Sequence, residues 1–311
     1  VNFMRLNSGG LAIFYCQKNS KGGDCRVMMR TSTDEGRTFA DPKQLSPAGK
    51  YTGLTNGRCI RLSTGRILLE AWEGGDSYCC ISDDDGQTWR DGGRIKPEGG
   101  PCYEPACIEL KDGRVLMLMR TYSGYVLKAY SEDHGASWGP GIKVLELKLP
   151  NTSSALCVKR IPSTGDLLLL RCSAGPQEPF RWRTPFVSIL SKDEGETWTN
   201  ERVLMGAPDN DYGYPSITFV ENVALIAYHQ RDGLHPSLTS RLHRRQRIHR
   251  LARFADHENH RSWLLRRVQH RDESVRHGPG GAGSEDAGNR HARGQHVRLH
   301  GRGDMACFRH S

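Results

Sequence analysis

Ser32-Thr-Asp-Glu-Gly-Arg-Thr-Phe39 is the stretch of sequence that decides the fold, because the chain repeats its pattern three more times without a gap. The shared pattern is Ser-x-Asp-x-Gly-x-Thr/Ser-Trp/Phe. Four copies of a pattern this long, at near-even intervals, indicate an internal structural repeat. The other copies are Ser82-Asp-Asp-Asp-Gly-Gln-Thr-Trp89, Ser131-Glu-Asp-His-Gly-Ala-Ser-Trp138 and Ser191-Lys-Asp-Glu-Gly-Glu-Thr-Trp198.

The repeated segment has the composition of a tight turn. Its aspartate can accept backbone N–H bonds, its glycine permits a positive φ, and its final aromatic residue can wedge between neighbouring sheets. Four copies of one catalytic acid would be redundant, whereas four copies of one turn are what repetition produces. We therefore expect a structural role for the repeated aspartates, which are Asp34, Asp84, Asp133 and Asp193.

Short apolar runs separated by glycine turns fill the space between successive copies. One interval contains Arg58-Cys-Ile-Arg-Leu62, the turn Ser63-Thr-Gly65 and then Arg66-Ile-Leu-Leu69. Four strands in about fifty residues are typical of one β-propeller blade. The sequence predicts an all-β fold with blades over residues 1–48, 52–98, 102–148 and 151–206, and a fifth blade that stops part-way, over 212–231.

The last part of the chain, residues 235–311, differs sharply in composition. It is rich in Arg, His and Gly, lacks Lys, and carries the whole formal net charge of +9, while residues 1–234 are balanced. This change predicts a boundary between a propeller at 1–234 and a tail at 235–311. The tail is typical of a GC-rich gene translated in a shifted frame, or of a disordered basic segment. A nucleic-acid patch around His243–Arg250 is a third interpretation, but the balanced charge of the propeller argues against a nucleic-acid partner.

Composition also limits the class of protein. No apolar run reaches the roughly eighteen residues that a membrane span needs. The ten cysteines include no Cys-x-x-Cys pair, so we expect no metal site and no cofactor. The chain starts at Val1 rather than Met, which predicts an incomplete start and leaves a secreted, periplasmic or cytoplasmic location open. The oligomeric state is open as well.

The direction of the strands sorts the candidate functional residues by face. In a four-stranded antiparallel blade, the first and third strands start on the face opposite the repeated turn. Glu104 and Tyr214 occupy equivalent positions at the start of innermost strands, six residues before the apolar residue that precedes the next turn. Arg120 ends a second strand, while Asp24 and Arg183 each begin a third strand. We expect all five side chains on one face, opposite the repeated turns.

The repeated turn resembles the Asp box of sialidases and related BNR-repeat propellers, and the resemblance covers residues 1–231. Further matches are Tyr103-Glu104-Pro105, Leu118-Met-Arg-Thr121, the arginine of Arg183-Thr-Pro-Phe186, and Tyr212-Gly-Tyr214 at the start of the next blade. The resemblance implies a six-bladed propeller of sialidase type, of which about four and a half blades are visible. It also implies an exo-glycoside hydrolase that acts on glycans with a terminal acidic sugar.

This resemblance assigns a chemical role to three residues. Tyr214 is the expected nucleophile, because a carboxylate nucleophile would meet the like charge that a sialoside carries on its anomeric carbon. Glu104 is expected to accept the phenol proton, and Asp24 to protonate the leaving oxygen. Two of them also have a structural interpretation: Tyr214 could pack at a blade junction, and Gly22-Gly23-Asp24 could be an ordinary hairpin turn, whereas Glu104 has no evident structural role.

The arginines are the expected ligands of the substrate carboxylate. Arg120 and Arg183 match two of the three family arginines and could form forked hydrogen bonds, although arginines also bridge blades. The first family arginine would precede Val1, and Arg58 is a candidate substitute. The alternative function is a non-catalytic carbohydrate-binding or scaffold propeller, but an acid–tyrosine pair on the axial face favours an enzyme.

Overall fold

The computed structural model describes residues 1–95, 100–149, 154–173, 183–207, 210–221, 223–231, 244–251 and 265–267. The chain divides into two units, Val1–Gln269 and His270–Ser311, and the second lies outside the described residues. The boundary predicted at residues 234–235 also falls outside them. In the described part of the chain, no helix is long and apolar enough to cross a membrane.

Five four-stranded antiparallel sheets follow one another along the first unit, and within each sheet the strands are in sequence order. Sheets one and two contain β1 (Asn2–Arg5), β2 (Leu11–Lys18), β3 (Cys25–Ser32), β4 (Lys43–Gln44), then β5 (Thr52–Arg61), β6 (Ile67–Glu73), β7 (Asp76–Ser82) and β8 (Arg90–Asp91). Sheets three and four contain β9 (Cys102–Glu109), β10 (Val115–Thr121), β11 (Tyr125–Ser131), β12 (Ile142–Lys148), then β13 (Cys157–Arg160), β14 (Leu167–Cys172), β15 (Phe186–Ser191) and β16 (Thr199–Met205). Sheet five contains β17 (Asp211–Val220), β18 (Val223–Arg231), β19 (Arg244–Leu251) and β20 (Leu265–Arg267).

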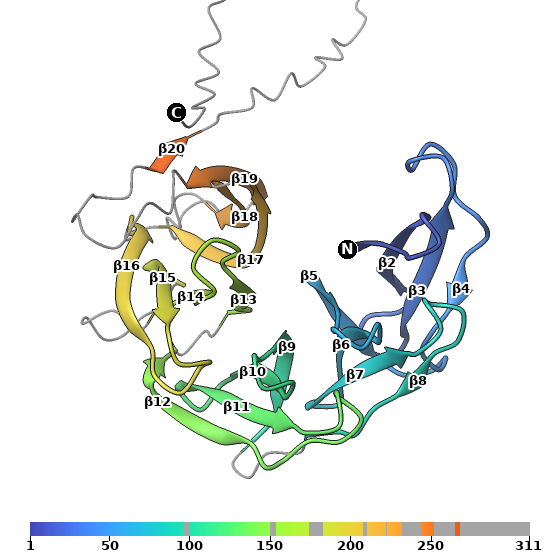
Figure 1. Cartoon of the computed structure of the whole chain (residues 1–311), viewed down its shortest axis with the longest axis horizontal. Helices are drawn as coiled ribbons and strands as arrows, with labels where there is room; N and C mark the ends of the chain where they lie inside the picture. Colours follow the sequence, from blue (N-terminus) through green and yellow to red (C-terminus); the bar gives the residue numbers. More distant parts are fainter. Residues whose placement is uncertain are drawn as a thin grey trace, which may run out of the picture. The chain divides into compact units, whose positions relative to one another are not determined.

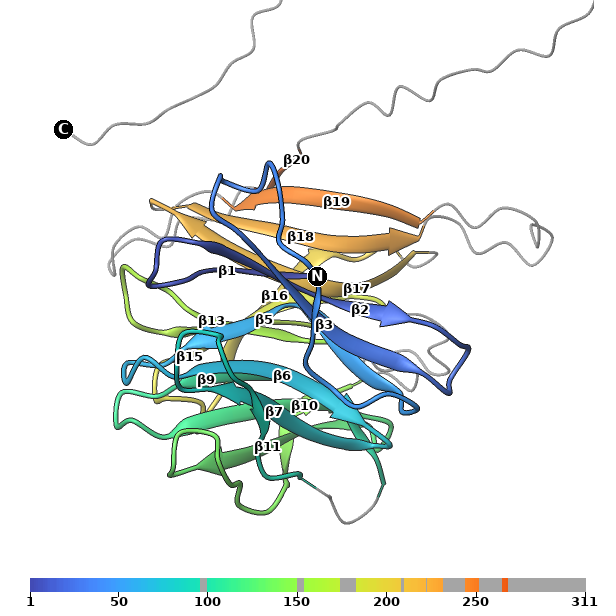
Figure 2. The ribbon, with the colours of Figure 1, turned by 90° about the vertical axis from the view of Figure 1, so that its right-hand side faces the viewer.

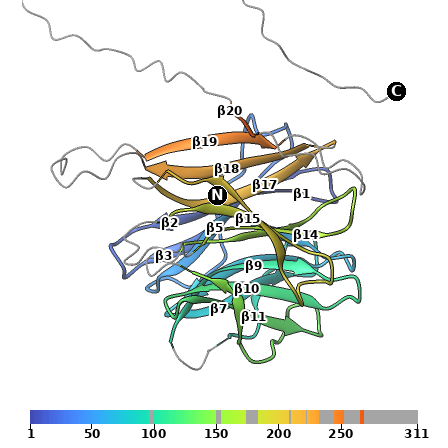
Figure 3. The same cartoon turned by 90° about the vertical axis from the view of Figure 1, so that its left-hand side faces the viewer.

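The five sheets are the blades of an incomplete β-propeller, as the sequence predicts. They form an arc around one axis, with the first strand of each blade innermost (Figure 1). Figure 2 and Figure 3 show that the strands run roughly along the direction in which Figure 1 is viewed. The ends of every strand therefore lie on one or the other face of the arc, and the repeated turns occupy the face opposite the starts of β9 and β17.

The fifth blade has more strands than the sequence predicts. β19 and β20 come from the predicted tail, yet β19 pairs antiparallel with β18 along its whole length, and β20 pairs with β19. A β-ladder is held by backbone N–H and C=O groups, so the open edge of β18 can pair with a segment that lacks an apolar pattern. Periodicity of side chains cannot detect such a strand.

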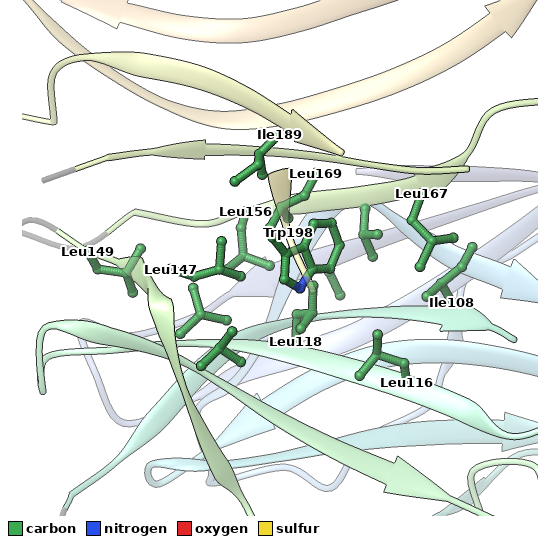
Figure 4. Packing of buried hydrophobic residues seen from close by; sticks show 14 of the residues in the cluster. Ile108, Leu116, Leu118, Leu147, Leu149, Leu156, Leu167, Leu169, Ile189 and Trp198 are labelled. Atoms are coloured by element: carbon green, nitrogen blue, oxygen red, sulfur yellow. The ribbon is translucent and has the colours of Figure 1, made fainter. Parts of the chain in front are cut away.

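Apolar side chains fill the space between neighbouring sheets. Between the third and fourth blades, leucines of β10 and β14 surround the indole of Trp198, which is 6% exposed (Figure 4). Trp198 is the last residue of the fourth repeated turn, so the expected wedge is confirmed there. In the second turn, the ring of Trp89 meets that of Phe14 edge-on at 5.4 Å, across the first junction.

A closed set of hydrogen bonds holds each repeated turn. In the first copy, the Asp34 carboxylate accepts the Thr38 N–H at 2.8 Å and the Thr38 hydroxyl at 2.6 Å, and Ser32 Oγ donates to it at 2.7 Å. The Gly36 N–H donates to Ser32 Oγ at 2.9 Å. The same bonds recur around Asp84, Asp133 and Asp193. The repeated aspartate is therefore structural, as expected.

The residue after each repeated aspartate adopts a left-handed backbone, with φ of 58 to 61° in the four copies. This conformation directs the side chain toward the preceding blade. Asp85 accepts the N–H groups of Asn7 and Ser8 at 3.0 and 3.1 Å, and Glu194 accepts the N–H of Lys111 at 3.0 Å. An acid of one blade thus caps the first turn of its neighbour.

The third repeated turn has a histidine, His134, where the second and fourth have these acids. There the capping acid comes from another strand: Glu109 of β9 accepts the N–H of Ser63 at 2.7 Å and its hydroxyl at 2.7 Å. In the second and fourth blades the position equivalent to Glu109 is an arginine, which pairs with the capping acid. These pairs are Arg61–Asp85 at 2.6 Å and Arg160–Glu194 at 2.7 Å.

Asp84→Asn should weaken the fold and reduce its sensitivity to acid. Hydrogen bonds from Thr88 lower the pKa of Asp84 to about 2, below the value of about 3.9 expected in the unfolded chain. The stability that Asp84 provides is therefore complete above about pH 4 and is lost as the pH falls through 2. Thermal unfolding between pH 7 and 2 should show a lower Tm at pH 7 and a shallower acid decline for Asp84→Asn. The exposed Glu132→Gln is the control, and an unchanged acid decline would contradict this account.

Glu194→Gln should loosen the junction between the third and fourth blades. The substitution removes the charge that strengthens the bonds from Lys111 and Arg160, while the side-chain volume stays the same. We expect the free energy of unfolding to fall by about 1–2 kcal/mol in urea titrations. Glu146→Gln, on the exposed side of β12, should change it by less than about 0.5 kcal/mol. Equal effects of the two variants would show that the cap is not stabilising.

Candidate active site

Two equivalent β-bulges shape the start of the innermost strands β9 and β17. The register between β9 and β10 shifts next to Glu104, and the register between β17 and β18 shifts next to Tyr214. Both residues have a positive φ, 50° for Glu104 and 52° for Tyr214, which is uncommon for residues other than glycine. Bulges redirect a side chain out of the alternating pattern of a strand. The same bulged backbone conformation thus sets the direction of both side chains.

Glu104 and Arg120 form a buried ion pair. Glu104 Oε2 lies 2.7 Å from Arg120 Nη1, and each residue is 6% exposed. Arg120 ends β10, directly beside the start of β9, because the two strands are antiparallel neighbours. The second terminal nitrogen of Arg120, Nη2, donates to the phenol oxygen of Tyr122 at 2.6 Å. Glu104 and Arg120, both predicted site residues, therefore lie in direct contact.

The electrostatics of Tyr214 link it to three of the predicted residues. Burial raises the pKa of the Tyr214 phenol, and the negative charge of Glu104 raises it further. The charges of Arg183 and Arg120, and a hydrogen bond from Arg183, act in the opposite direction. The Arg183 guanidinium carbon lies 5.5 Å from the centre of the Tyr214 ring. One electrostatic cluster therefore comprises Tyr214, Arg183 beside it, and the Glu104–Arg120 ion pair, whose charges act on the phenol.

Contacts across the axis fix the backbone of this cluster. Asn56 of β5 donates its side-chain N–H to the carbonyl of Tyr214 at 3.0 Å. Gly57 is packed so closely that an added Cβ would lie 2.8 Å from Cβ of Ser216. On the other side, Asp211 accepts the backbone N–H of Arg183 at 3.2 Å. The second and fifth blades thus meet at the site, although they are not neighbours in sequence.

Asp24 lies in the hairpin between β2 and β3, held in an ion pair with Arg26. Arg26 donates from Nε and Nη2 to the carboxylate at 2.9 to 3.1 Å, and Asn19 donates at 2.9 Å. Hydrogen bonds from Arg26 and then Asn19 lower the pKa of Asp24 to about 2. In this arrangement the carboxyl is ionised at neutral pH, so it holds no proton to donate.

Arg58 is buried inside the second blade, at 2% exposure. Its backbone N–H donates to the side chain of Asn2, while its guanidinium nitrogens have no hydrogen-bond partner among the described residues. Its charge acts on Glu70 of β6, a carboxyl whose burial raises its pKa to about 7. Within the described residues, no group of three or more His, Cys, Asp or Glu side chains is arranged to hold a metal ion.

A row of aromatic side chains that was not predicted from the sequence lies along the rim of the second and third blades. Ring centres follow one another at 5.4, 5.2 and 5.9 Å from Tyr51 through Trp72 and Tyr103 to Tyr122. Each of the four lies at a strand end on the face of Glu104 and Arg120. The recurrence of aromatic residues at the ends of successive strands is visible in the sequence. Their contacts could not be predicted from it, because they cross between blades.

Comparison with known proteins gives a consistent result. Residues 1–229 match the BNR repeat-like domain family. The sialidase of Micromonospora viridifaciens is 33% identical over 215 residues, which cover 59% of this chain and 32% of that protein. Sialidase B of Streptococcus pneumoniae is 31% identical over 100 residues, which cover 30% of this chain and 14% of that protein. The chain thus spans about a third or less of the curated relatives it matches.

Solved structures share the fold at low sequence identity. The intramolecular trans-sialidase of Ruminococcus gnavus matches with a TM-score of 0.59 at 19% identity, over 73% of this chain and 50% of that one. A protein of unknown function from Dyadobacter fermentans matches with a TM-score of 0.57 at 17% identity, over 79% of this chain and 74% of that one. The repeated turns, the blades built around them and the match over residues 1–229 all agree: the chain belongs to the BNR repeat-like domain family and has the fold of a sialidase propeller.

Proposed function

We propose that this chain carries the active site of a sialidase-type exo-glycoside hydrolase that acts on a terminal acidic sugar. The observation that supports it most is the cluster of a buried tyrosine, a glutamate and two arginines on the axial face. Tyr214 and Glu104 reach this cluster from blades that are not adjacent, through equivalent bulges. The sialidases among the relatives support the same class of reaction.

In this mechanism Tyr214 is the nucleophile and Glu104 takes its proton. The raised pKa of Tyr214 keeps the phenol neutral in the resting enzyme, so it can approach an anomeric carbon that bears a carboxylate. As the phenol oxygen bonds to that carbon, its proton passes to Glu104. Neutralising Glu104 removes the charge that disfavours the phenolate, so attack and proton transfer assist each other. Water then displaces the tyrosine from the anomeric carbon: Asp24, a carboxylate once it has protonated the leaving oxygen, takes a proton from the water, and Glu104 returns its proton to the phenol oxygen.

The two arginines of the cluster hold the substrate carboxylate. Arg183 lies against the ring of Tyr214, the charge of Arg120 also acts on its phenol, and both arginines provide several N–H donors in planar, forked geometry. Their positive charge also stabilises the phenolate that leaves in the second step. Asp24 is the acid for the departing oxygen, and to act it must leave Arg26 and take up a proton. Substrate contacts with the β2–β3 hairpin are the expected trigger.

Tyr214→Phe should abolish turnover and leave the fold intact, because only the nucleophilic oxygen is removed. We expect the hydrolysis of an aryl sialoside to fall at least about a hundredfold, and Glu104→Gln to do the same, since an amide cannot accept the proton. Tyr130→Phe, on the face of the repeated turns, is the control and should retain activity. Near-full turnover by Tyr214→Phe would instead favour a carbohydrate-binding or scaffold propeller.

Glu104→Gln should also lower the pKa of the Tyr214 phenol. Removing a negative charge that disfavours the phenolate makes the proton easier to lose, whereas Arg183→Ala removes a favourable charge and should raise the pKa. Ultraviolet absorbance titration of each variant, with Tyr214→Phe as the subtracted reference, isolates this one phenol. Identical titrations of the wild type and Glu104→Gln would show that the two side chains do not interact.

A further inference from the structure

Both terminal nitrogens of Arg120 are engaged by protein groups. Nη1 donates to Glu104 at 2.7 Å, and Nη2 donates to the hydroxyl oxygen of Tyr122 at 2.6 Å. The remaining nitrogen, Nε, is buried and has no hydrogen-bond partner among the described residues. A carboxylate that approaches Arg120 from the open face therefore meets Tyr122 first. Tyr122 is 56% exposed, while Arg120 is 6% exposed.

We propose that Tyr122 is a displaceable cap on Arg120, whose hydroxyl occupies the position that the carboxylate of the substrate takes when it binds. This inference rests on the proposed function, because it assigns Arg120 to the substrate carboxylate. It makes Tyr122 a residue that determines specificity for anionic sugars.

The exchange of ligands on Arg120 favours a carboxylate over the phenol. Arg120 is charged in both cases, but a carboxylate adds its own negative charge, and it can receive two N–H groups in a forked geometry where a phenol receives one. Tyr122 also packs its ring against the guanidinium, with 5.0 Å from the guanidinium carbon to the ring centre. A neutral sugar offers no oxygen able to replace both contacts, so it leaves the cap closed.

The surroundings allow the side chain to move while the backbone stays in place. Thr121 Oγ1 donates to the carbonyl of Tyr125 at 2.6 Å and accepts the N–H of Ser123 at 3.1 Å, which fixes the turn on both sides of Tyr122. A hollow of about 130 Å³ lies beside the ring, lined among others by Pro101 and Lys143. Rotation of Tyr122 into this space requires no change in the strand pairing.

A ligand of Arg120 can bind only to molecules in which the cap is open. Its apparent affinity is therefore the intrinsic affinity multiplied by the fraction of open molecules. Removing only the hydroxyl should therefore tighten binding. Tyr122→Phe in the full-length chain should bind the unsaturated sialic acid 2-deoxy-2,3-didehydro-N-acetylneuraminic acid between about twofold and tenfold more tightly than the wild type, by isothermal titration calorimetry. Tyr125→Phe, three residues further along the same turn, should bind as the wild type does. Unchanged or weaker binding by Tyr122→Phe overturns the proposal.

A second measurement tests in the absence of sugar whether Tyr122 covers Arg120. Phenylglyoxal modifies accessible guanidinium groups, and peptide mass spectrometry can follow the modification of Arg120 alone. Tyr122→Ala should raise the rate at Arg120 several-fold over the wild type and over Tyr125→Ala, and an equal rate overturns the cap. If Tyr122→Ala exposes Arg120 but neither the wild type nor the variants bind the sugar or hydrolyse an aryl sialoside, the cap stands and the proposed function fails.

Discussion

The hydrogen bonds that each repeated aspartate accepts are the constraint on which the rest of the structure depends. One carboxylate fixes the end of a third strand and the start of a fourth, and four such turns set the length and register of four blades. Because these turns occupy one face, the starts of the innermost strands must open on the other. The acids that follow two of these aspartates, Asp85 and Glu194, then attach the second blade to the first and the fourth to the third. Local turn chemistry thus determines where a site can form.

The bulges at Glu104 and Tyr214 explain how a repeated backbone can carry different functional side chains. The repeat provides the same backbone position in the third and fifth blades, and a left-handed residue there turns its side chain out of the strand. Equivalent positions of a repeated scaffold can therefore carry different functional groups. Here the third blade provides a carboxylate and the fifth blade a phenol. Asn56 of the second blade completes the arrangement by holding the carbonyl of Tyr214.

The cluster carries a net positive charge, because it holds two arginines and one glutamate while Tyr214 is neutral. Glu104 is paired with Arg120, and Tyr214 is neutral because burial and Glu104 both disfavour its ionised form. An anionic ligand adds a negative charge that Arg183 and Arg120 can offset. Asp24 is not part of this cluster, because it lies in the β2–β3 hairpin, where Arg26 keeps it ionised. In the proposed mechanism, the resting structure therefore has its nucleophile in the cluster, while Arg26 holds the leaving-group acid in an ion pair.

The sequence by itself determined the repeated turn, the blades and the common face of Glu104, Arg120, Arg183 and Tyr214, because turn composition and alternating apolar residues are local properties. Only the tertiary structure decided the partners of these side chains. The ion pair of Glu104 and the caps between blades join residues that are distant in sequence, and the hydrogen bond from Arg120 to Tyr122 depends on the directions of two side chains at the end of β10. The pairing of Asp24 with Arg26 depends on the path of a hairpin, which composition does not fix. β19 and β20 were missed because backbone pairing to an open strand edge leaves no periodic signal in the side chains.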